Sequence, residues 1–282
     1  MKQKIRLFAI FALLPFAVLV IAFEILPLIR MIIDSFLNDE GNAYTLNQYI
    51  TAFSNPYYSK GMINSLLISI YSSLIGISIA LVTSYSITQM PKKVQSIIIT
   101  FSNMTSNFSG IPLAFAYIIL LGTSGLFTLL FKELGWDIFS SFNLYSWSGL
   151  IAVYVYFQVP LGILLLYPTY SGIQKSWRES ASLLGASSFQ FWWHIGLPVI
   201  FPSIVGTFSI LFANAMGAYA TAYALVGGSY NLITIRIASL VGGDVINRPH
   251  LGSTMAVILG LMMIGAMLLN ERMMRRVRRD LK

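Results

Sequence analysis

The chain of 282 residues has no cysteine, two histidines and few charged side chains. Without cysteine it can form no disulfide, thiolate metal site or cysteine nucleophile. His194 and His250 are too few for a histidine-built metal centre, so we expect no metal or cofactor. The motifs of a P-loop, a nucleophile elbow and a zinc protease are also absent, and we expect no catalytic residue on this chain.

Charged residues make up 10% of the chain, against roughly 25% in ordinary soluble domains. Hydrophobic residues make up 56%, and the mean hydropathy is +0.74. No soluble fold of this length could hide that much apolar surface from water. The chain is therefore predicted to be an integral membrane protein in contact with the lipid bilayer. Its net charge of +8 is expected to act through its distribution across the membrane, and we expect no nucleic-acid partner.

Charged residues divide the sequence into apolar pieces, and a helix needs about 20 apolar residues to span a bilayer. We predict an all-α polytopic membrane protein with one transmembrane domain over residues 1–282. The one ambiguous stretch is 180–235, which we count as a single span because Pro198 and Pro202 would break a helix. The N-terminus also resembles a signal peptide, but we expect an uncleaved first helix. The predicted spans are about 7–29, 62–88, 97–121, 148–170, 204–226 and 251–270.

Charge distribution supports six spans with both termini in the cytoplasm. A seventh span would place the basic C-terminal tail outside, against the positive-inside rule. With six spans, 13 of the 18 Lys and Arg residues lie on the cytoplasmic side. They are Lys2, Lys4, Arg6, Lys92, Lys93, Lys175, Arg178, Arg272, Arg275, Arg276, Arg278, Arg279 and Lys282.

The cytoplasmic segment between spans four and five, about 175–203, is longer than a turn requires. Residues 177–191 are predicted to form one helix with a stripe of residues at helical spacing, in which Gly185 permits a bend. Pro198 is expected to end the helix. The segment either rests on lipid headgroups or docks in a groove of a protein. Its small residues and low content of Lys and Arg favour docking.

The order Glu179-Ser180-Ala181, Gly185 and Ile195-Gly196-Leu197-Pro198 resembles the EAA motif, E-A-A-x(3)-G-x(9)-I-x-L-P. This motif occurs in membrane subunits of type I ABC importers that use a binding protein. Ser180 stands where the family usually has Ala, a change small enough to keep the packing. The six spans resemble these permeases over nearly the whole chain. The stretch 107–121 is similar to permeases for polyamines, iron and phosphonates.

The resemblance implies that the segment is a coupling helix in a cleft of a separate ATP-hydrolysing subunit. It assigns Glu179, Ser180, Ala181 and Gly185 to docking and the turn. Ile195, Leu197 and Pro198 would then shape the return into span five. The implied partners are ABC ATPase subunits, an extracytoplasmic solute-binding protein and a second permease, different or identical. The implied role is solute import across the cell membrane, with a polyamine as the first expectation for the solute.

Span five carries polar side chains among small ones. Asn214, Tyr219, Thr221 and Tyr223 either pack across a helix interface or line a water-filled path, and the sequence leaves both open. Glu24 is the one charge well inside a span and becomes a candidate for the pathway. It also lies near the outer end of its helix, close to Arg30, where it could pair locally. The alternative function is a secondary carrier or channel that uses Glu24 as its ion or proton site.

Overall fold

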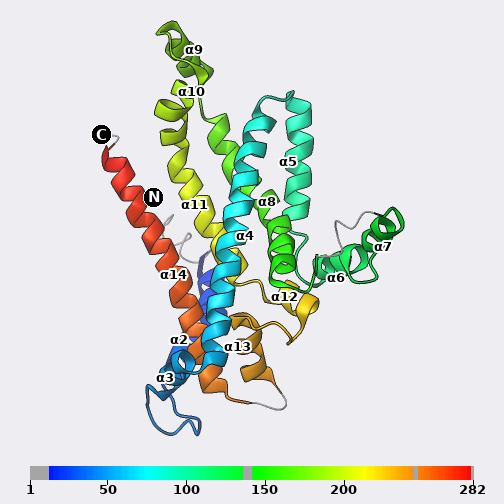
Figure 1. Ribbon diagram of the computed structural model, residues 1–282. Coiled ribbons are helices and arrows are strands. Elements are labelled where there is room, and N and C mark those ends of the chain that lie inside the picture. The colour runs from blue at the N-terminus through cyan, green and yellow to red at the C-terminus, as the bar shows by residue number, and fades with distance from the viewer. Residues whose placement is uncertain (1–12, 136–141, 244–246, 281–282) are drawn as a thin grey trace. The chain divides into compact units, whose positions relative to one another are not determined.

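A computed structural model describes residues 13–135, 142–243 and 247–280. The described residues form helices joined by short connections, and the β-type pairing found among them is one isolated bridge between Leu37 and Tyr44. Figure 1 shows their order along the chain. The helices are η1 (Ile21–Ile25), α2 (Leu26–Asp34), α3 (Asn47–Ser54), α4 (Pro56–Thr88), α5 (Lys92–Ser106), α6 (Ile111–Leu121), α7 (Leu126–Glu133), α8 (Trp147–Ser171), α9 (Lys175–Leu183), α10 (Ser188–Phe191), η3 (Trp192–Gly196), α11 (Leu197–Met216), α12 (Tyr219–Val226), α13 (Ile233–Gly242) and α14 (Pro249–Asp280).

Within the described ranges, six helical segments are long and apolar enough to cross a membrane. The all-α class and the number of spans are therefore as predicted. The segments are Leu13–Asp34, Pro56–Thr88, Ile111–Glu133, Trp147–Ser171, Ser188–Met216 and Pro249–Leu269.

The chain divides into two compact units. Unit 1 comprises the described residues up to Gly61 together with Arg236–Leu261, and unit 2 comprises Met62–Ile235 and the chain from Met262 onward. In unit 1, Thr254 of α14 donates a hydrogen bond to the carbonyl of Ser35, just after α2, at 2.9 Å. The Ser35 hydroxyl lies 2.8 Å from the hydroxyl of Tyr49 in α3. These bonds connect α14 to α2 and α3, which lie far earlier in the sequence.

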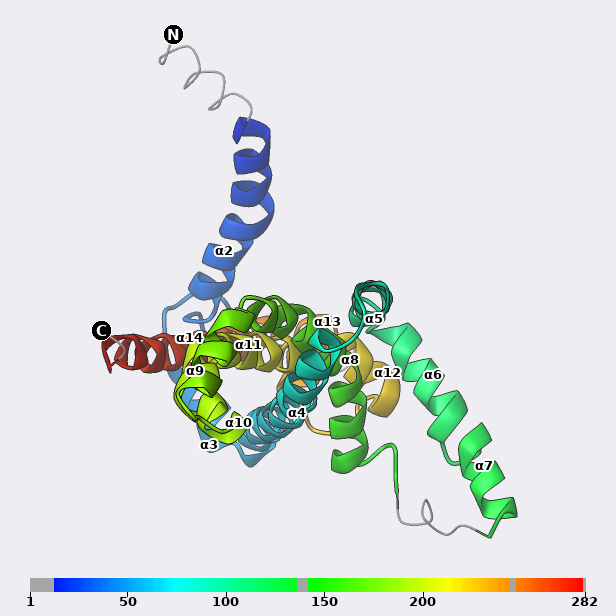
Figure 2. The same cartoon turned by 90° about the horizontal axis from the view of Figure 1, so that it is seen from above.

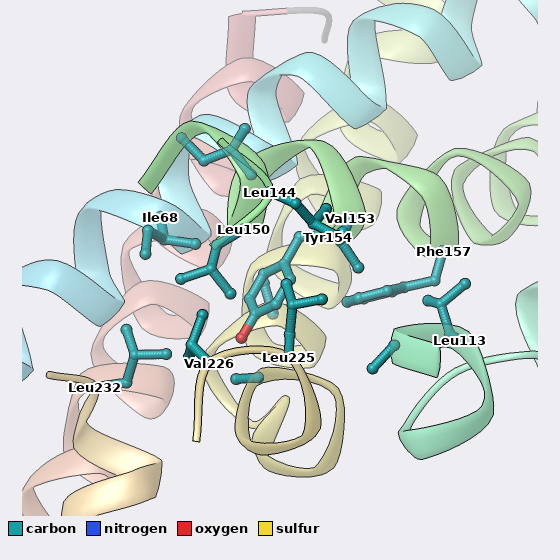
Figure 3. Packing of buried hydrophobic residues seen from close by; sticks show 14 of the residues in the cluster. Ile68, Leu113, Leu144, Leu150, Val153, Tyr154, Phe157, Leu225, Val226 and Leu232 are labelled. Carbon is teal, nitrogen blue, oxygen red and sulfur yellow. The ribbon is translucent and has the colours of Figure 1, made fainter. Parts of the chain in front are cut away.

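The core of unit 2 is built around α8. This helix packs against α5 and α11, while α12 packs against α6. Tyr154 and Phe157 of α8 lie in one apolar cluster with Leu113 of α6 and Leu225 of α12, as Figure 3 shows. Because lipid tails are as apolar as these side chains, close packing rather than exclusion of water stabilises such contacts.

A second cluster joins α4, α8 and α11 through Ile77, Leu166 and Leu211. Gly162 of α8 lies so close to α4 that a Cβ atom built on it would be 2.8 Å from the Cβ of Ala80. A glycine facing an alanine lets the two helix backbones approach closely, as in other membrane helix pairs.

The predicted third span, 97–121, is interrupted in the structure. Helix α5 ends at Ser106 and α6 begins at Ile111, and Gly110 between them has φ +77°. Only glycine adopts this backbone conformation without steric cost. Charge alone could not detect the break, because the whole stretch is uncharged. Helices α6 and α7 continue away from α5 (Figure 2).

The expectation that Pro198 and Pro202 break the helix is wrong. The segment Ser188–Met216 is continuous, with Pro202 inside α11. Directly before the Leu197–Pro198 pair lies the π-helical turn η3, and the Leu197 N–H donates to the Trp192 carbonyl at its start. The wider turn shifts the hydrogen-bond register by one residue, so the helix continues past Pro198, which has no backbone N–H to donate.

The predicted fifth span, 204–226, is also two helices. Helix α11 ends at Met216 and α12 begins at Tyr219. The hydroxyl of Tyr154 in α8 donates to the carbonyl of Ala218 at 3.0 Å. That bond links α8 to the residue that precedes α12.

We predict that Gly162→Ala lowers the free energy of unfolding by about 1–3 kcal/mol, because the added methyl overpacks the α4–α8 contact. Unfolding in detergent by heat or by sodium dodecyl sulfate measures this change. Gly206→Ala is the matched control, since a Cβ there meets nothing within 4 Å. Equal stability of the two variants would contradict the close contact.

Candidate functional sites

The segment with the EAA-like pattern lies beyond the ends of α8 and α11 (Figure 1) and consists of two helices rather than one. Helix α9 ends at Leu183 and α10 begins at Ser188, so the single helix predicted for 177–191 is wrong. Gly185 between them has φ +82°. The Ala186 N–H donates to the Ala181 carbonyl and the Gly185 N–H to the Ser182 carbonyl, at 3.0 Å each. This pair of bonds is a Schellman cap, which requires the left-handed conformation that glycine supplies.

Helix α10 begins with a capping box. The Ser187 side chain accepts a bond from the Gln190 N–H, and the Gln190 side chain accepts one from the Ser187 N–H. Two backbone donors at the helix start are thereby satisfied. The turn between α9 and α10 is thus fixed at both ends by its own sequence.

The residues of the EAA-like pattern in this segment differ in how exposed their side chains are. Glu179, Ser180 and Gly185 are exposed, while Ala181 is buried. The most exposed large side chains are Leu183 and Leu184, each 89% exposed, at the turn. Phe189 and Trp193 are 75% and 60% exposed, and their rings stack with centroids 6.2 Å apart. The segment therefore presents apolar side chains that the chain itself does not cover.

The remaining motif residues lie in the helix that leads away from the segment. Ile195 is in η3, and Leu197 and Pro198 are the first two residues of α11. The structure therefore places them in a continuous helix and not in a separate turn.

A cavity of about 1040 Å³ lies between this segment and the ends of α4, α5 and α8. It is lined mainly by polar and aromatic side chains. Residues of both the α4–α5 connection and the α8–α9 connection contribute to this lining. Its lining includes Tyr85, Thr88, Gln89, Lys92, Gln95, Tyr170, Gln174, Lys175, Arg178, Glu179, Ser188 and Trp192.

Gln95 of α5 stabilises the wall of this cavity through hydrogen bonds. It is buried, and its side-chain amide donates to the carbonyls of Met90 and Thr88 at 2.8 and 3.3 Å. Its side-chain oxygen accepts a bond of 2.7 Å from the Tyr167 hydroxyl of α8. One glutamine therefore links the α4–α5 connection to α8.

Three of the four polar candidates of span five line a second, smaller cavity. This cavity of about 310 Å³ lies at the break between α11 and α12 and has Asn214, Tyr219 and Thr221 in its lining, together with Phe157. The side chains of Asn214 and Tyr219 are exposed. Tyr223 does not line the cavity, but its ring stacks on that of Tyr219 with centroids 5.4 Å apart. The lining contains no charged residue.

Thr221 also has a packing role. It is 3% exposed, and its hydroxyl accepts a 2.8 Å bond from the backbone N–H of Gly110. That N–H belongs to the break between α5 and α6. Thr221 thus satisfies a backbone group freed by the break in the third predicted span.

Glu24 is not among the residues that line either cavity. It is exposed in the π-helical turn η1 of unit 1. Its expected local partner, Arg30, forms an ion pair with Asp34 at 3.1 Å instead. Nothing in the described geometry gives Glu24 the surroundings of an ion or proton site.

The sequence patterns missed one polar cluster, in unit 1. Arg248 binds Asp39 with both its Nε and Nη2 atoms, the shortest contact being 2.8 Å, and Gln48 donates to the same carboxylate at 3.0 Å. Both hydrogen bonds lower the pKa of Asp39. His250 Nδ1 lies 3.2 Å from the carbonyl of Asp34. The bonds join two loops more than 200 residues apart, a pairing that no local pattern indicates.

A model of the family of binding-protein-dependent transport system inner membrane components matches residues 72–282. The chain belongs to this family. The match includes both cavities and the whole α9–α10 segment, and it confirms the resemblance inferred from the EAA-like pattern.

Individual relatives agree with this assignment. The chain is 24% identical to the osmoprotective compounds uptake permease protein GgtC of Synechocystis sp., over 89% of this chain and 93% of the relative. It is 24% identical to the spermidine/putrescine transport system permease protein PotB of Haemophilus influenzae, over 95% and 91%. It is also 24% identical to the putative ferric transport system permease protein FbpB 1 of the same organism, but it spans only 39% of that relative's length.

Solved structures share the fold. A chain of a bacterial ABC transporter that imports the acidic polysaccharide alginate aligns with a TM-score of 0.75 and 19% identity, over 98% of this chain and 96% of that chain. A chain of the MetNI methionine ABC transporter aligns with a TM-score of 0.58 and 16% identity, over 78% and 95%.

We predict that the Asp39–Arg248 pair makes stability depend on pH in the acidic range. Because the folded-state pKa of Asp39 is lowered, its contribution is present above the unfolded value near pH 4 and is lost as pH falls through the folded value. Both partners are partly exposed, so the contribution is only about 0.2–1 kcal/mol. Unfolding in detergent between pH 7 and pH 3 measures it, with Asp39→Asn as the comparison. A constant difference between the two proteins over this range would contradict the pairing.

Proposed function

We propose that the chain is the membrane-spanning permease subunit of an ATP-driven ABC importer. In this proposal, it moves a small solute delivered by an extracytoplasmic binding protein, and ATP is hydrolysed on a separate subunit. The observation that carries the proposal is the α9–α10 segment, which combines the EAA-like pattern with uncovered apolar side chains beyond the spans. Family membership supports the same role.

The proposed contact with the ATPase is the turn around Gly185. Leu183 and Leu184 are rigidly presented by the Schellman cap and the capping box, and apolar side chains on a fixed turn suit a groove in a protein. Glu179 and Ser180 are exposed beside them, and Ala181 is buried. Closure of the ATPases on ATP would then displace the segment and drive alternating access.

The proposed orientation places this segment and both termini in the cytoplasm of a cell carrying the subunit in its cell membrane. The large cavity supports the same sidedness for the α4–α5 and α8–α9 connections, because residues of both line it. In unit 1, the Asp39–Arg248 pair supports a common side for the loop after α2 and the loop before α14. A second permease, different or identical, would complete the transport path.

For the solute, a polyamine remains the first candidate. The exposed ring of Tyr219 in the smaller cavity offers an aromatic surface for a cation, and Asn214 offers an amide oxygen. The names of the relatives refer to osmoprotective compounds, ferric iron and spermidine/putrescine. These names do not indicate one chemical class of solute. We propose Asn214, Tyr219 and Tyr223 as pathway residues and Thr221 as a packing residue at the cavity wall.

We predict that Leu184→Asp reduces co-purification of the ATPase with this chain by at least about tenfold, because a charge replaces an apolar anchor in a desolvated contact. Mild-detergent purification of the tagged chain, followed by mass spectrometry, measures the ratio of the two subunits. Leu46→Asp is the control, since Leu46 is an exposed leucine outside the segment. An ATPase absent from the unaltered chain, or retained equally by Leu184→Asp, would overturn the proposal.

We predict that Asn214→Leu raises the KM for uptake several-fold, up to about tenfold, because one hydrogen bond to a neutral group contributes roughly 0.5–1.5 kcal/mol. Radiolabelled spermidine in vesicles that contain the assembled importer is the first probe. Asn47→Ala, at an exposed asparagine outside the cavity lining, should leave KM unchanged. If Asn214→Leu takes up spermidine with an unaltered KM, Asn214 does not line the transport path. If the unaltered importer takes up no spermidine, polyamines are excluded as the solute.

A further inference from the structure

Three aromatic rings meet beside the larger cavity in unit 2. Tyr85 of α4, Tyr170 of α8 and Trp192 of η3 form a triangle that we term the aromatic clasp. The ring centroids of Tyr85 and Trp192 are 5.1 Å apart, those of Tyr170 and Trp192 are 6.0 Å apart, and those of Tyr85 and Tyr170 are 6.1 Å apart. Each pair lies within the distance at which edge-to-face or tilted rings attract one another.

Gly196 fixes the position of the tryptophan ring. A Cβ atom on Gly196 would lie 2.3 Å from Cε3 and 2.7 Å from Cζ3 of Trp192, closer than atoms can approach. The indole therefore lies directly over the backbone one turn later, where only glycine leaves room. Phe191 also contacts the indole edge to face, with ring centroids 5.8 Å apart. Trp192 is thus held by its own helix as well as by α4 and α8.

The clasp connects helices that the backbone does not. The α9–α10 segment continues by chain into α8 on one side and into α11 on the other. Helix α4 has no such connection, because α5 to α8 lie between them in sequence. Trp192 directly follows α10, and its edge-to-face contact with Tyr85 gives α4 a direct mechanical contact with the segment.

We propose that Trp192 is a positioning residue that makes α4 move with the α9–α10 segment. This inference rests on the proposed function, in which the ATPase displaces that segment. A rigid, packed indole transmits displacement because close-packed interiors repack between discrete arrangements and do not deform continuously. Loss of the ring leaves α8 and α11 linked to the segment by backbone and leaves α4 without this link.

The test uses spin labels on the cysteine-free chain. Labels at Ser176→Cys in α9 and Val82→Cys in α4, two exposed positions, report the distance between the segment and α4. The distance distribution is measured by pulsed electron paramagnetic resonance on the purified chain. It is measured again on the assembled complex, with cysteine-free partner subunits, before and after addition of ATP and vanadate. The four variants are Trp192→Ala, Trp192→Phe, Gly196→Ala and the control Gly206→Ala.

We expect a narrow distribution in the unaltered chain that ATP and vanadate leave unchanged. Trp192→Ala and Gly196→Ala should broaden it by at least about twofold, because the packed contact that fixes the distance is lost or displaced. Trp192→Phe, which keeps an aromatic ring, and Gly206→Ala, whose Cβ meets open space, should remain narrow. Gly196→Ala retains all three rings, so it decides the matter if Trp192→Ala does not accumulate.

A Gly196→Ala distribution as narrow as that of Gly206→Ala would overturn the clasp. A distance that shifts on addition of ATP and vanadate in the unaltered complex would overturn it as well. Absence of an ATPase from the purified complex would instead overturn the proposed function, while the widths measured on the chain alone would still decide whether the clasp fixes α4.

Discussion

The requirement that every backbone N–H and C=O inside a bilayer find a partner within the protein governs this structure. Each proline lacks a backbone N–H donor. At two prolines the helix continues through the same local arrangement. The π-helical turns Ile21–Ile25 and Trp192–Gly196 are each followed directly by a Leu-Pro pair. In both, the leucine N–H donates to the carbonyl five residues earlier, at the first residue of the turn. The wider turn carries the helix past the proline without ending it.

Where the helices do end inside apolar stretches, a side chain of another helix bonds to the backbone beside the break. Thr221 accepts the N–H of Gly110 at the break between α5 and α6, and Tyr154 donates to Ala218 at the break between α11 and α12. These polar side chains are thereby committed to the fold. Asn214 and Tyr219, which lie at the same place, keep exposed side chains beside the smaller cavity. The backbone requirement thus distinguishes packing residues from pathway candidates that composition alone could not separate.

The sequence predicted the all-α class and six spans because apolar length is a property of each segment alone. It did not predict the break at 107–110, because no charge interrupts that stretch. The sequence predicts that Pro198 ends the helix, because the register shift depends on hydrogen bonds that a sequence does not display. The spacing of its residues indicates the α9–α10 segment, yet the exposure of Leu183 and Leu184 depends on the turn at Gly185. The Asp39–Arg248 pair requires tertiary contact and has no local signature.

Continuity of the helix from Ser188 to Met216 gives the proposed coupling a geometric consequence. One end of this element lies next to the segment that would contact the ATPase, and the other carries Asn214 to the smaller cavity. Helix α12 lies beyond the break and is tied through Thr221 to the start of α6. The cavity is therefore lined partly by an element that would move with the segment and partly by one anchored elsewhere in unit 2. Displacement of the segment would change the shape of the cavity because the helix breaks at Gly217 and not before it. An unbroken span five would move both walls together.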